Sequence, residues 1–140
     1  MSFSFQGLDH VQLTAPLNSE KEVREFFVEL LECKEIEKPE TLSHFDSLWF
    51  EMGTTILHIG LDENHKAEKR GHPAFEVNNI GDLMAHLEAN DVEFEEDFNL
   101  PGARRFYTYA FFGHRMEFLE WEEKPDAMIT ALEREQMKKQ

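Results

Sequence analysis

Three histidines and one glutamate lie at matching places in the two halves of the sequence. His10 is inside the alternating run Leu-Asp-His-Val-Gln-Leu, and His72 begins the run His-Pro-Ala-Phe-Glu-Val. Further along each half, His58 and Glu117 lie in the apolar runs Ile-Leu-His-Ile and Met-Glu-Phe-Leu. The interval from His10 to His58 nearly equals that from His72 to Glu117, which is typical of an internal repeat. We therefore predict that the four side chains form one pseudo-symmetric site.

Imidazole and carboxylate groups are ligands for Zn, Ni, Co, Mn or Fe(II), and they do not suit Ca or a soft thiolate site. Four protein ligands leave two positions open on an octahedral ion, and a substrate with two neighbouring oxygens could occupy both. The ion would then act as a Lewis acid that stabilises an enediolate or oxyanion. The predicted cofactor is one divalent metal ion, and the ligand types leave its identity open.

Each predicted ligand also has an ordinary structural interpretation. A single histidine on a strand is more often a cavity residue than a ligand, so the case for His10 and His72 depends on their equivalence in the repeat. Glu117 would be costly to bury without a cation. Its alternative partners are Arg104, Arg105 and Arg115. His58 is compatible with lining a cavity without binding a metal. The remaining histidines are predicted to be solvated: His44, His65, His86 and His114.

The elements that must position these residues follow from periodicity. Residues 7–14 alternate as a strand does, and Ser19 with Glu22 has the pattern of a capping box that opens a helix. Strand patterns follow around 35–38, 45–52 and 54–60. After His72 the same order returns, with a helix over 80–89 and strands near 92–96, 104–110 and 115–121. Each half therefore predicts a β-α-β-β-β module.

One such half-sheet leaves its concave face unfilled unless another packs beside it. We predict an α+β fold in which two tandem modules, about 5–62 and 70–122, form a curved mixed sheet around a central cavity. The two modules make one domain over residues 1–124. Pro125 ends the last strand, and residues 125–140 are predicted to be a helical tail in which Asp126 caps a helix over roughly 127–138.

Composition limits the function classes. The chain has 140 residues, 41% of them hydrophobic, and 13 are Phe, which predicts a packed core. Its formal charge of −15 argues against nucleic acid or an anionic membrane as a partner. We find no transmembrane or signal-peptide pattern. The single cysteine, Cys33, excludes an internal disulfide and fits a cytoplasmic location.

Four segments of the chain resemble the vicinal oxygen chelate superfamily, which includes glyoxalase I, bleomycin resistance proteins and extradiol dioxygenases: Asp9–Val11, Leu57–Gly60, Gly71–Phe75 and Phe112–Phe118. The resemblance covers about residues 7–121. It implies a glyoxalase-like fold, and it implies that the positions of His10, His58, His72 and Glu117 hold the metal. Glyoxalase I usually has Glu at the position of His58, so Glu117 is the one predicted ligand that could also act as the catalytic base.

Three further residues are predicted to bind substrate. Arg105 lies in a segment, residues 100–107, that resembles a stretch common in small members of the superfamily. It could bind an anionic group, although pairing with a surface carboxylate is equally compatible with the sequence. Tyr107 could orient the substrate, and Trp49 could supply a stacking wall.

Three functions remain open at this stage. We favour a metal-dependent lyase, isomerase or epimerase, because ligand-type residues occupy all four positions. The first alternative is a metal-free module that binds an aromatic compound, as bleomycin resistance proteins do. The second is an Fe(II) ring-cleaving dioxygenase, in which His58 would crowd the oxygen site. The expected partners are a small-molecule substrate and a second copy in a homodimer, with the cavity formed within one chain or across the dimer.

Overall fold

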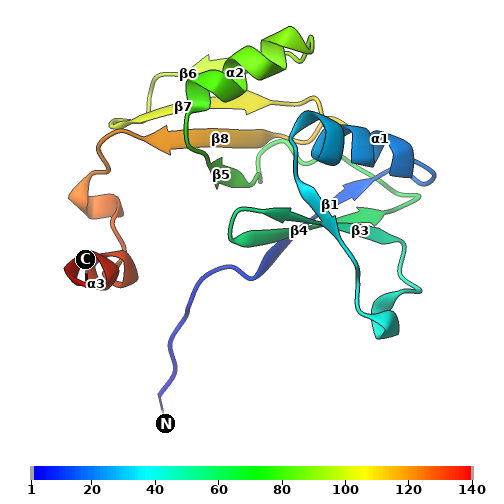
Figure 1. Cartoon of the computed structure of the whole chain (residues 1–140), viewed down its shortest axis with the longest axis horizontal. Coiled ribbons are helices and arrows are strands. Elements are labelled where there is room, and N and C mark those ends of the chain that lie inside the picture. Colours follow the sequence, from blue (N-terminus) through cyan, green and yellow to red (C-terminus); the bar gives the residue numbers. More distant parts are fainter. Residues whose placement is uncertain (1, 140) are drawn as a thin grey trace. The chain divides into compact units, whose positions relative to one another are not determined.

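The computed structural model of the chain describes residues 2–139, which form two compact units. Unit 1 comprises residues 2–69 and 111–113, and unit 2 comprises residues 70–110 and 114–139. Each unit has its own four-stranded sheet and helical segments of its own (Figure 1).

Unit 1 contains one mixed sheet with the strand order β1-β4-β3-β2. Strand β1 runs parallel to β4, and the other neighbours are antiparallel. Its elements in chain order are β1 (His10–Ala15), α1 (Glu20–Arg24) continued by a π-helical segment (Glu25–Leu30), β2 (Lys34–Ile36), a 3-10 turn (Glu40–Leu42), β3 (Ser47–Met52) and β4 (Thr55–Leu61).

The core of unit 1 joins the helical segment to one face of this sheet. Phe27 stacks on Phe50 at 5.1 Å between ring centroids and meets Phe111 edge-on at 4.8 Å. Phe50 pairs in register with Leu57, so both lie on the helix side of the sheet. Because side chains alternate along a strand, the neighbouring His58 points to the opposite face.

Unit 2 repeats this topology with the strand order β5-β8-β7-β6, and β5 runs parallel to β8. Its elements are β5 (Ala74–Glu76), α2 (Ile80–Ala89), β6 (Glu95–Asp97), β7 (Ala103–Thr108) and β8 (Met116–Trp121). The predicted α+β class and the β-α-β-β-β order of each half are confirmed. Each sheet is open and keeps its own edge strands.

Helix α2 is fixed to its sheet by packing and by an unforeseen cap. Its inward residue Leu87 is 1% exposed, and Phe106 and Phe118 stack at 5.2 Å beneath it. The carboxylate of Glu120 accepts hydrogen bonds from the backbone N–H groups of Asn79 and Ile80, both at 3.0 Å. These backbone bonds lower the pKa of Glu120. Glu120 of β8 thus caps α2 from a distant part of the sequence.

Neither of the two predicted helix caps forms. The backbone of Ser19, at φ −106° and ψ 18°, is not in the extended conformation of a capping residue, and its hydroxyl donates to the carbonyl of Pro16 at 2.6 Å. The predicted cap at Asp126 is also wrong, since only a 3-10 turn (Asp126–Met128) begins there. Helix α3 (Ala131–Lys138) begins after Thr130, which forms a complete capping box with Glu133.

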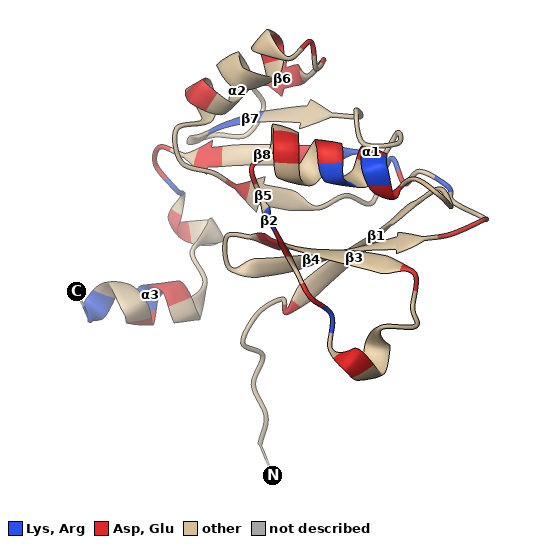
Figure 2. Ribbon diagram, turned by 45° about the vertical axis from the view of Figure 1, so that its right-hand side comes forward, with Lys and Arg blue, Asp and Glu red and all other residues tan. Residues whose placement is uncertain are grey.

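Acidic residues lie on all three helices, as Figure 2 shows, in keeping with the net charge. In the tail, Lys124 forms an ion pair with Glu133 at 2.8 Å and so links the end of the last strand to α3. No helix in residues 2–139 has the length and apolar character needed to cross a membrane.

Candidate functional site

In unit 2, the predicted site residues lie on the sheet face that points away from α2. Glu117 of β8 lies opposite Tyr107 of β7 in the antiparallel register. The next pair, Phe118 and Phe106, lies on the helix side. Alternation along the two strands therefore presents the carboxylate and the phenol together on the face without the helix.

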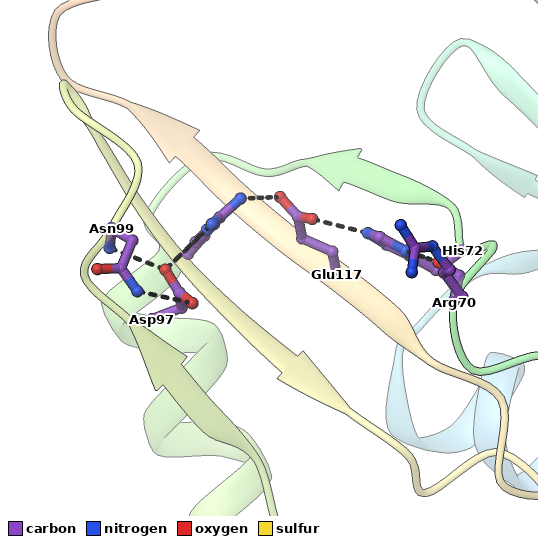
Figure 3. A network of polar contacts seen from close by, with 6 residues as sticks. Arg70, His72, Asp97, Asn99 and Glu117 are labelled. Carbon is purple, nitrogen blue, oxygen red and sulfur yellow. Dashed lines mark hydrogen bonds and ion pairs between the residues drawn. The ribbon is translucent and has the colours of Figure 1, made fainter.

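His72 and Glu117 meet directly (Figure 3). Nε2 of His72 lies 3.1 Å from Oε1 of Glu117, and Nδ1 of His72 lies 2.8 Å from the backbone carbonyl of Arg70. A carbonyl oxygen only accepts hydrogen bonds, so Nδ1 carries the proton. A neutral His72 would then direct a lone pair at a carboxylate. The contact is favourable only when a cation, either a second proton or a metal ion, lies between the two atoms.

Two further groups contact Glu117, which is only 6% exposed. Nη1 of Arg105 lies 3.5 Å from Oε2, and Tyr107 lies opposite Glu117 on the same face of the sheet. Burial, followed by the charge of Glu117, raises the pKa of Tyr107. The tyrosine therefore remains a hydrogen-bond donor at neutral pH.

Arg105 is shared between two carboxylates. Its Nε and Nη2 lie 3.2 Å and 3.1 Å from Oδ1 of Asp97. The same Asp97 oxygen accepts the backbone N–H of Asn99 at 2.8 Å, and this bond is the main cause of the lowered pKa of Asp97. Arg105 can bind a substrate anion only by giving up one of these pairs, so its predicted role stays a prediction.

In unit 1, the two predicted ligands lie in a stack of three rings. The His58 ring is parallel to the indole of Trp49, at 3.9 Å and 3°, and to the His10 ring, at 4.3 Å and 14°. Burial, with the nearby His10 as a second cause, lowers the pKa of His58, which favours a neutral ring. Nδ1 of His10 lies 2.9 Å from a carboxylate oxygen of Asp9.

This stacking limits how the two imidazoles could share a metal. An imidazole binds a metal through a lone pair in the plane of its ring. Two nearly parallel rings cannot both direct such lone pairs at one ion. His10 and His58 could ligate the same ion only after one ring has rotated out of the stack.

The stack lines an open cavity of about 660 Å³ that is formed by unit 1 alone. Gln12, Thr14 and Ile56 line it beside the rings, and no Lys or Arg is among its lining residues. The side chain of Gln12 lies over Gly60, where an added Cβ would come within 3.1 Å of its amide nitrogen. Trp49 thus lies in a cavity wall, as a substrate-stacking role would require.

The structure brings the four predicted ligands together as two pairs, one in each unit. Among residues 2–139, no cluster of three or more His, Cys, Asp or Glu side chains is arranged to hold a metal ion. Two other histidines differ from the prediction of solvation. His114 is 3% exposed, and His65 bonds to the hydroxyl of Thr14 at 2.8 Å and to the carbonyl of Phe112 at 3.2 Å. The partners of His65 are distant in sequence, so no local pattern indicates them.

Comparison with solved structures identifies the family. No family model and no curated protein matches the chain. A glyoxalase family protein from Bacillus anthracis is 40% identical, with 86% of this chain and 99% of that chain covered and a TM-score of 0.82. This chain therefore belongs to the glyoxalase family, and its predicted place in the vicinal oxygen chelate superfamily is confirmed.

More distant structures share the fold. Lactoylglutathione lyase from Agrobacterium tumefaciens is 18% identical, with 81% of this chain and 92% of that chain covered and a TM-score of 0.62. The fosfomycin resistance protein FosX from Listeria monocytogenes is 20% identical, with 94% and 99% covered and a TM-score of 0.66. At these identities the likeness concerns the fold alone.

Proposed function

We propose that the protein is a metal-dependent enzyme of the glyoxalase type, a lyase, isomerase or epimerase that removes a proton next to a carbonyl group. His72 and Glu117 hold one divalent ion, together with His10 and His58. The observation that carries this proposal is the contact between Nε2 of His72 and Oε1 of Glu117 at 3.1 Å. Two ligand atoms bound to one ion at about 2.1 Å, on perpendicular bonds, lie about 3 Å apart.

The hydrogen bonds behind the ligands support the same assignment. A metal-binding histidine usually donates its other ring N–H to a carbonyl or carboxylate, which fixes the tautomer. His72 does so to the carbonyl of Arg70, and His10 has Asp9 at 2.9 Å from Nδ1. In both residues Nε2 is left for the ion. His58 completes the ligand set by rotating out of its stack; in the stack it forms a wall of the cavity.

When bound, the ion would supply Lewis-acid polarisation of a substrate oxygen. Glu117 is the base, and Oε2, the oxygen that does not face His72, receives the proton. Arg105 holds the carboxylate in place by an ion pair, and Tyr107 flanks it from the neighbouring strand. The low exposure of Glu117 keeps bulk water away from the transferred proton.

The superfamily supports the use of a divalent metal. A variant of FosX has been solved with Mn(II) and dihydroxypropylphosphonic acid, and it is 20% identical to this chain with a TM-score of 0.67. The identity of the metal in this chain is left open, as its ligand types imply. We also propose a small-molecule substrate and a homodimeric assembly, which light scattering after size-exclusion chromatography would test.

A second function is favoured by a different observation. The Trp49–His58–His10 stack gives the unit 1 cavity a flat aromatic wall, which suits a metal-free protein that binds a planar compound. This candidate needs neither His72 nor Glu117 as a ligand. Replacing His72 should therefore abolish metal binding in the first case and leave ligand binding unchanged in the second.

Metal content decides between them. Untagged protein, purified without chelator, is analysed by mass spectrometry for Ni, Zn, Mn, Co and Fe, beside the variants His72→Ala and Glu117→Gln. We expect near-stoichiometric metal in the wild type and its loss in both variants. His44→Ala, an exposed histidine outside the site, is the matched control and should keep the metal. Wild-type protein that holds no metal and takes none up would leave the binding protein as the better account.

A further inference from the structure

Arg115 carries a buried polar atom that the protein leaves unsatisfied. Among the described residues, its Nε is the one buried side-chain nitrogen or oxygen without a hydrogen-bond partner. A buried N–H without an acceptor destabilises the folded protein relative to a satisfied one. An atom kept in this state in a folded protein calls for an explanation, and a bound ligand is one.

In the part of the chain that the structure describes, Arg115 lacks a carboxylate partner, whereas three other arginines have one. Its sequence has 29 acidic residues against 14 basic ones. Arg24, Arg104 and Arg105 each form an ion pair with a carboxylate, at 2.8, 2.7 and 3.1 Å. Within residues 2–139, no Asp or Glu lies within ion-pair distance of Arg115. Although the protein is acidic, the guanidinium of Arg115 therefore has no carboxylate acceptor among these residues.

The position of Arg115 is fixed by an aromatic ring of the site. Its guanidinium carbon lies 4.1 Å from the centre of the Tyr107 ring, a close cation–π contact, whereas that of Arg105 lies 5.5 Å away. Tyr107 is the residue opposite Glu117 in the sheet. Arg115 also precedes Glu117 by two residues, just before β8 begins at Met116. Tyr107 therefore neighbours both residues, Arg115 through its ring and Glu117 through the strand register.

From this arrangement we infer that Arg115 binds an oxyanion of the substrate. The substrate class is a small carbonyl compound that carries a carboxylate or phosphonate a few bonds from the carbon that Glu117 deprotonates. A planar guanidinium offers paired N–H donors that match such a group, and Nε is one of them. The inference deepens the proposed function and rests on it in treating Glu117 as the reacting centre. It assigns to Arg115 the role that sequence predicted for Arg105.

The Nε–H group can be observed directly. In a proton–nitrogen NMR spectrum of ¹⁵N-labelled protein, the Arg115 Nε–H signal, assigned by its loss in Arg115→Lys, is followed during titration with acetate. Acetamide, of the same shape and uncharged, is titrated in parallel, and chloride keeps the ionic strength constant. We expect a saturable downfield shift of the Arg115 signal with acetate and none with acetamide. An Arg115 signal that does not respond to acetate would overturn the inference.

Variants supply the second half of the test. Arg115→Gln removes the charge and should weaken acetate binding by about tenfold or more. Arg104→Gln is the matched control, because Arg104 lies on the other face of β7 and already pairs with Glu96; it should bind acetate as the wild type does. Equal acetate affinity in wild type and Arg115→Gln contradicts the inference. If Arg115→Gln does not fold, the wild-type Nε–H titration still decides.

The outcome is separable from that of the metal experiment. The titration is repeated on protein stripped with chelator, since Arg115 is not a metal ligand and its signal reports the anion alone. Loss of metal binding with a retained anion response would remove the proposed reaction and leave the anion site. A bound metal without an anion response would leave the metalloenzyme and remove this substrate class.

Discussion

Tyr107 and Glu117 lie directly opposite each other on β7 and β8, and the charge of the carboxylate, after burial, raises the pKa of the phenol. One strand pair therefore carries both the predicted base and a neutral phenol beside it. The ring of Tyr107 also supports Arg115 from 4.1 Å. Tyr107 thus lies next to both Glu117, the proposed proton acceptor, and Arg115, the proposed binding residue for the substrate anion.

Replacing Tyr107 with Phe separates these two contacts. Tyr107→Phe keeps the ring under Arg115 and removes the hydroxyl group beside Glu117. We expect a loss of unfolding free energy of about 1 kcal/mol at pH 7, measured by urea denaturation. With a substrate of the proposed class, kcat should fall more than KM rises, because the anion contact is kept while the base loses its support.

The same variant changes the alkaline stability. The pKa of Tyr107 is raised above its ordinary value of 10.0, so the stabilisation is complete below pH 10 and is lost as the pH rises through the folded-state pKa. Wild-type protein should therefore lose stability above pH 10 more steeply than Tyr107→Phe. Parallel stability curves for the two proteins in this range would show that folding does not raise the pKa of the phenol.

The stack in unit 1 predicts a measurable titration. Trp49→Leu removes one covering face of His58, whose pKa is lowered chiefly by burial. The pKa of His58 should rise towards its ordinary value of 6.5, as followed by NMR of the imidazole. Trp121→Leu is the control, because Trp121 contacts Lys124 in unit 2, and it should leave the pKa of His58 where it is.

Two glycine substitutions should differ strongly in cost. In Gly60→Ala the new methyl would meet the flexible end of Gln12 at 3.1 Å, so we expect a loss of less than about 1 kcal/mol. Gly102 has φ +80°, and its added Cβ would lie 2.0 Å from the backbone oxygen of Glu123. Gly102→Ala should lose about 3 kcal/mol or more. Urea denaturation compares them, and similar midpoints would contradict this geometry.

Glu120 predicts an acid-dependent cap of α2. Its pKa is held below 4.5 by two backbone N–H groups, so its stabilisation is present above pH 4.5 and is lost as the pH falls through the folded-state value. Glu120→Gln should therefore be less stable than the wild type at pH 7, with a difference that shrinks in acid. The exposed Glu122→Gln serves as the control and should follow the wild type throughout.

Local patterns predicted the elements because they arise within a few residues. Alternation located the strands, and helical spacing located α2 to the residue, at 80–89. The capping boxes show where such patterns fail. Ser19 and Glu22 have the same spacing as Thr130 and Glu133, yet only the second pair forms the box.

The two residues differ in backbone conformation. Thr130 is extended, at φ −74° and ψ 162°, whereas Ser19 lies at φ −106° and ψ 18° and its hydroxyl donates to the carbonyl of Pro16, a partner that the pattern does not include.

The contacts between the polar side chains of the site were harder to predict from the sequence than the helices and strands. Equivalence in the repeat selected His72 and Glu117, which the structure brings to 3.1 Å. It could not indicate that His10 and His58 stack face to face, because ring orientation depends on rotamers that Trp49 helps to set. The sequence likewise could not show that Arg115 lacks a carboxylate partner in the described part of the fold, because that depends on where the distant Asp and Glu side chains lie in the folded protein.

The parallel rings of Trp49 and His58 make the fluorescence of Trp49 an intrinsic probe of the unit 1 cavity. Indole emission depends on the polarity and the ring contacts around it, and at 3.9 Å the imidazole covers one indole face. Any event that draws His58 away, whether an arriving ion or a planar guest in the cavity, exposes that face and changes the emission. Trp121, which lies in unit 2 beside Lys124, supplies a steady background against which the change can be followed in real time.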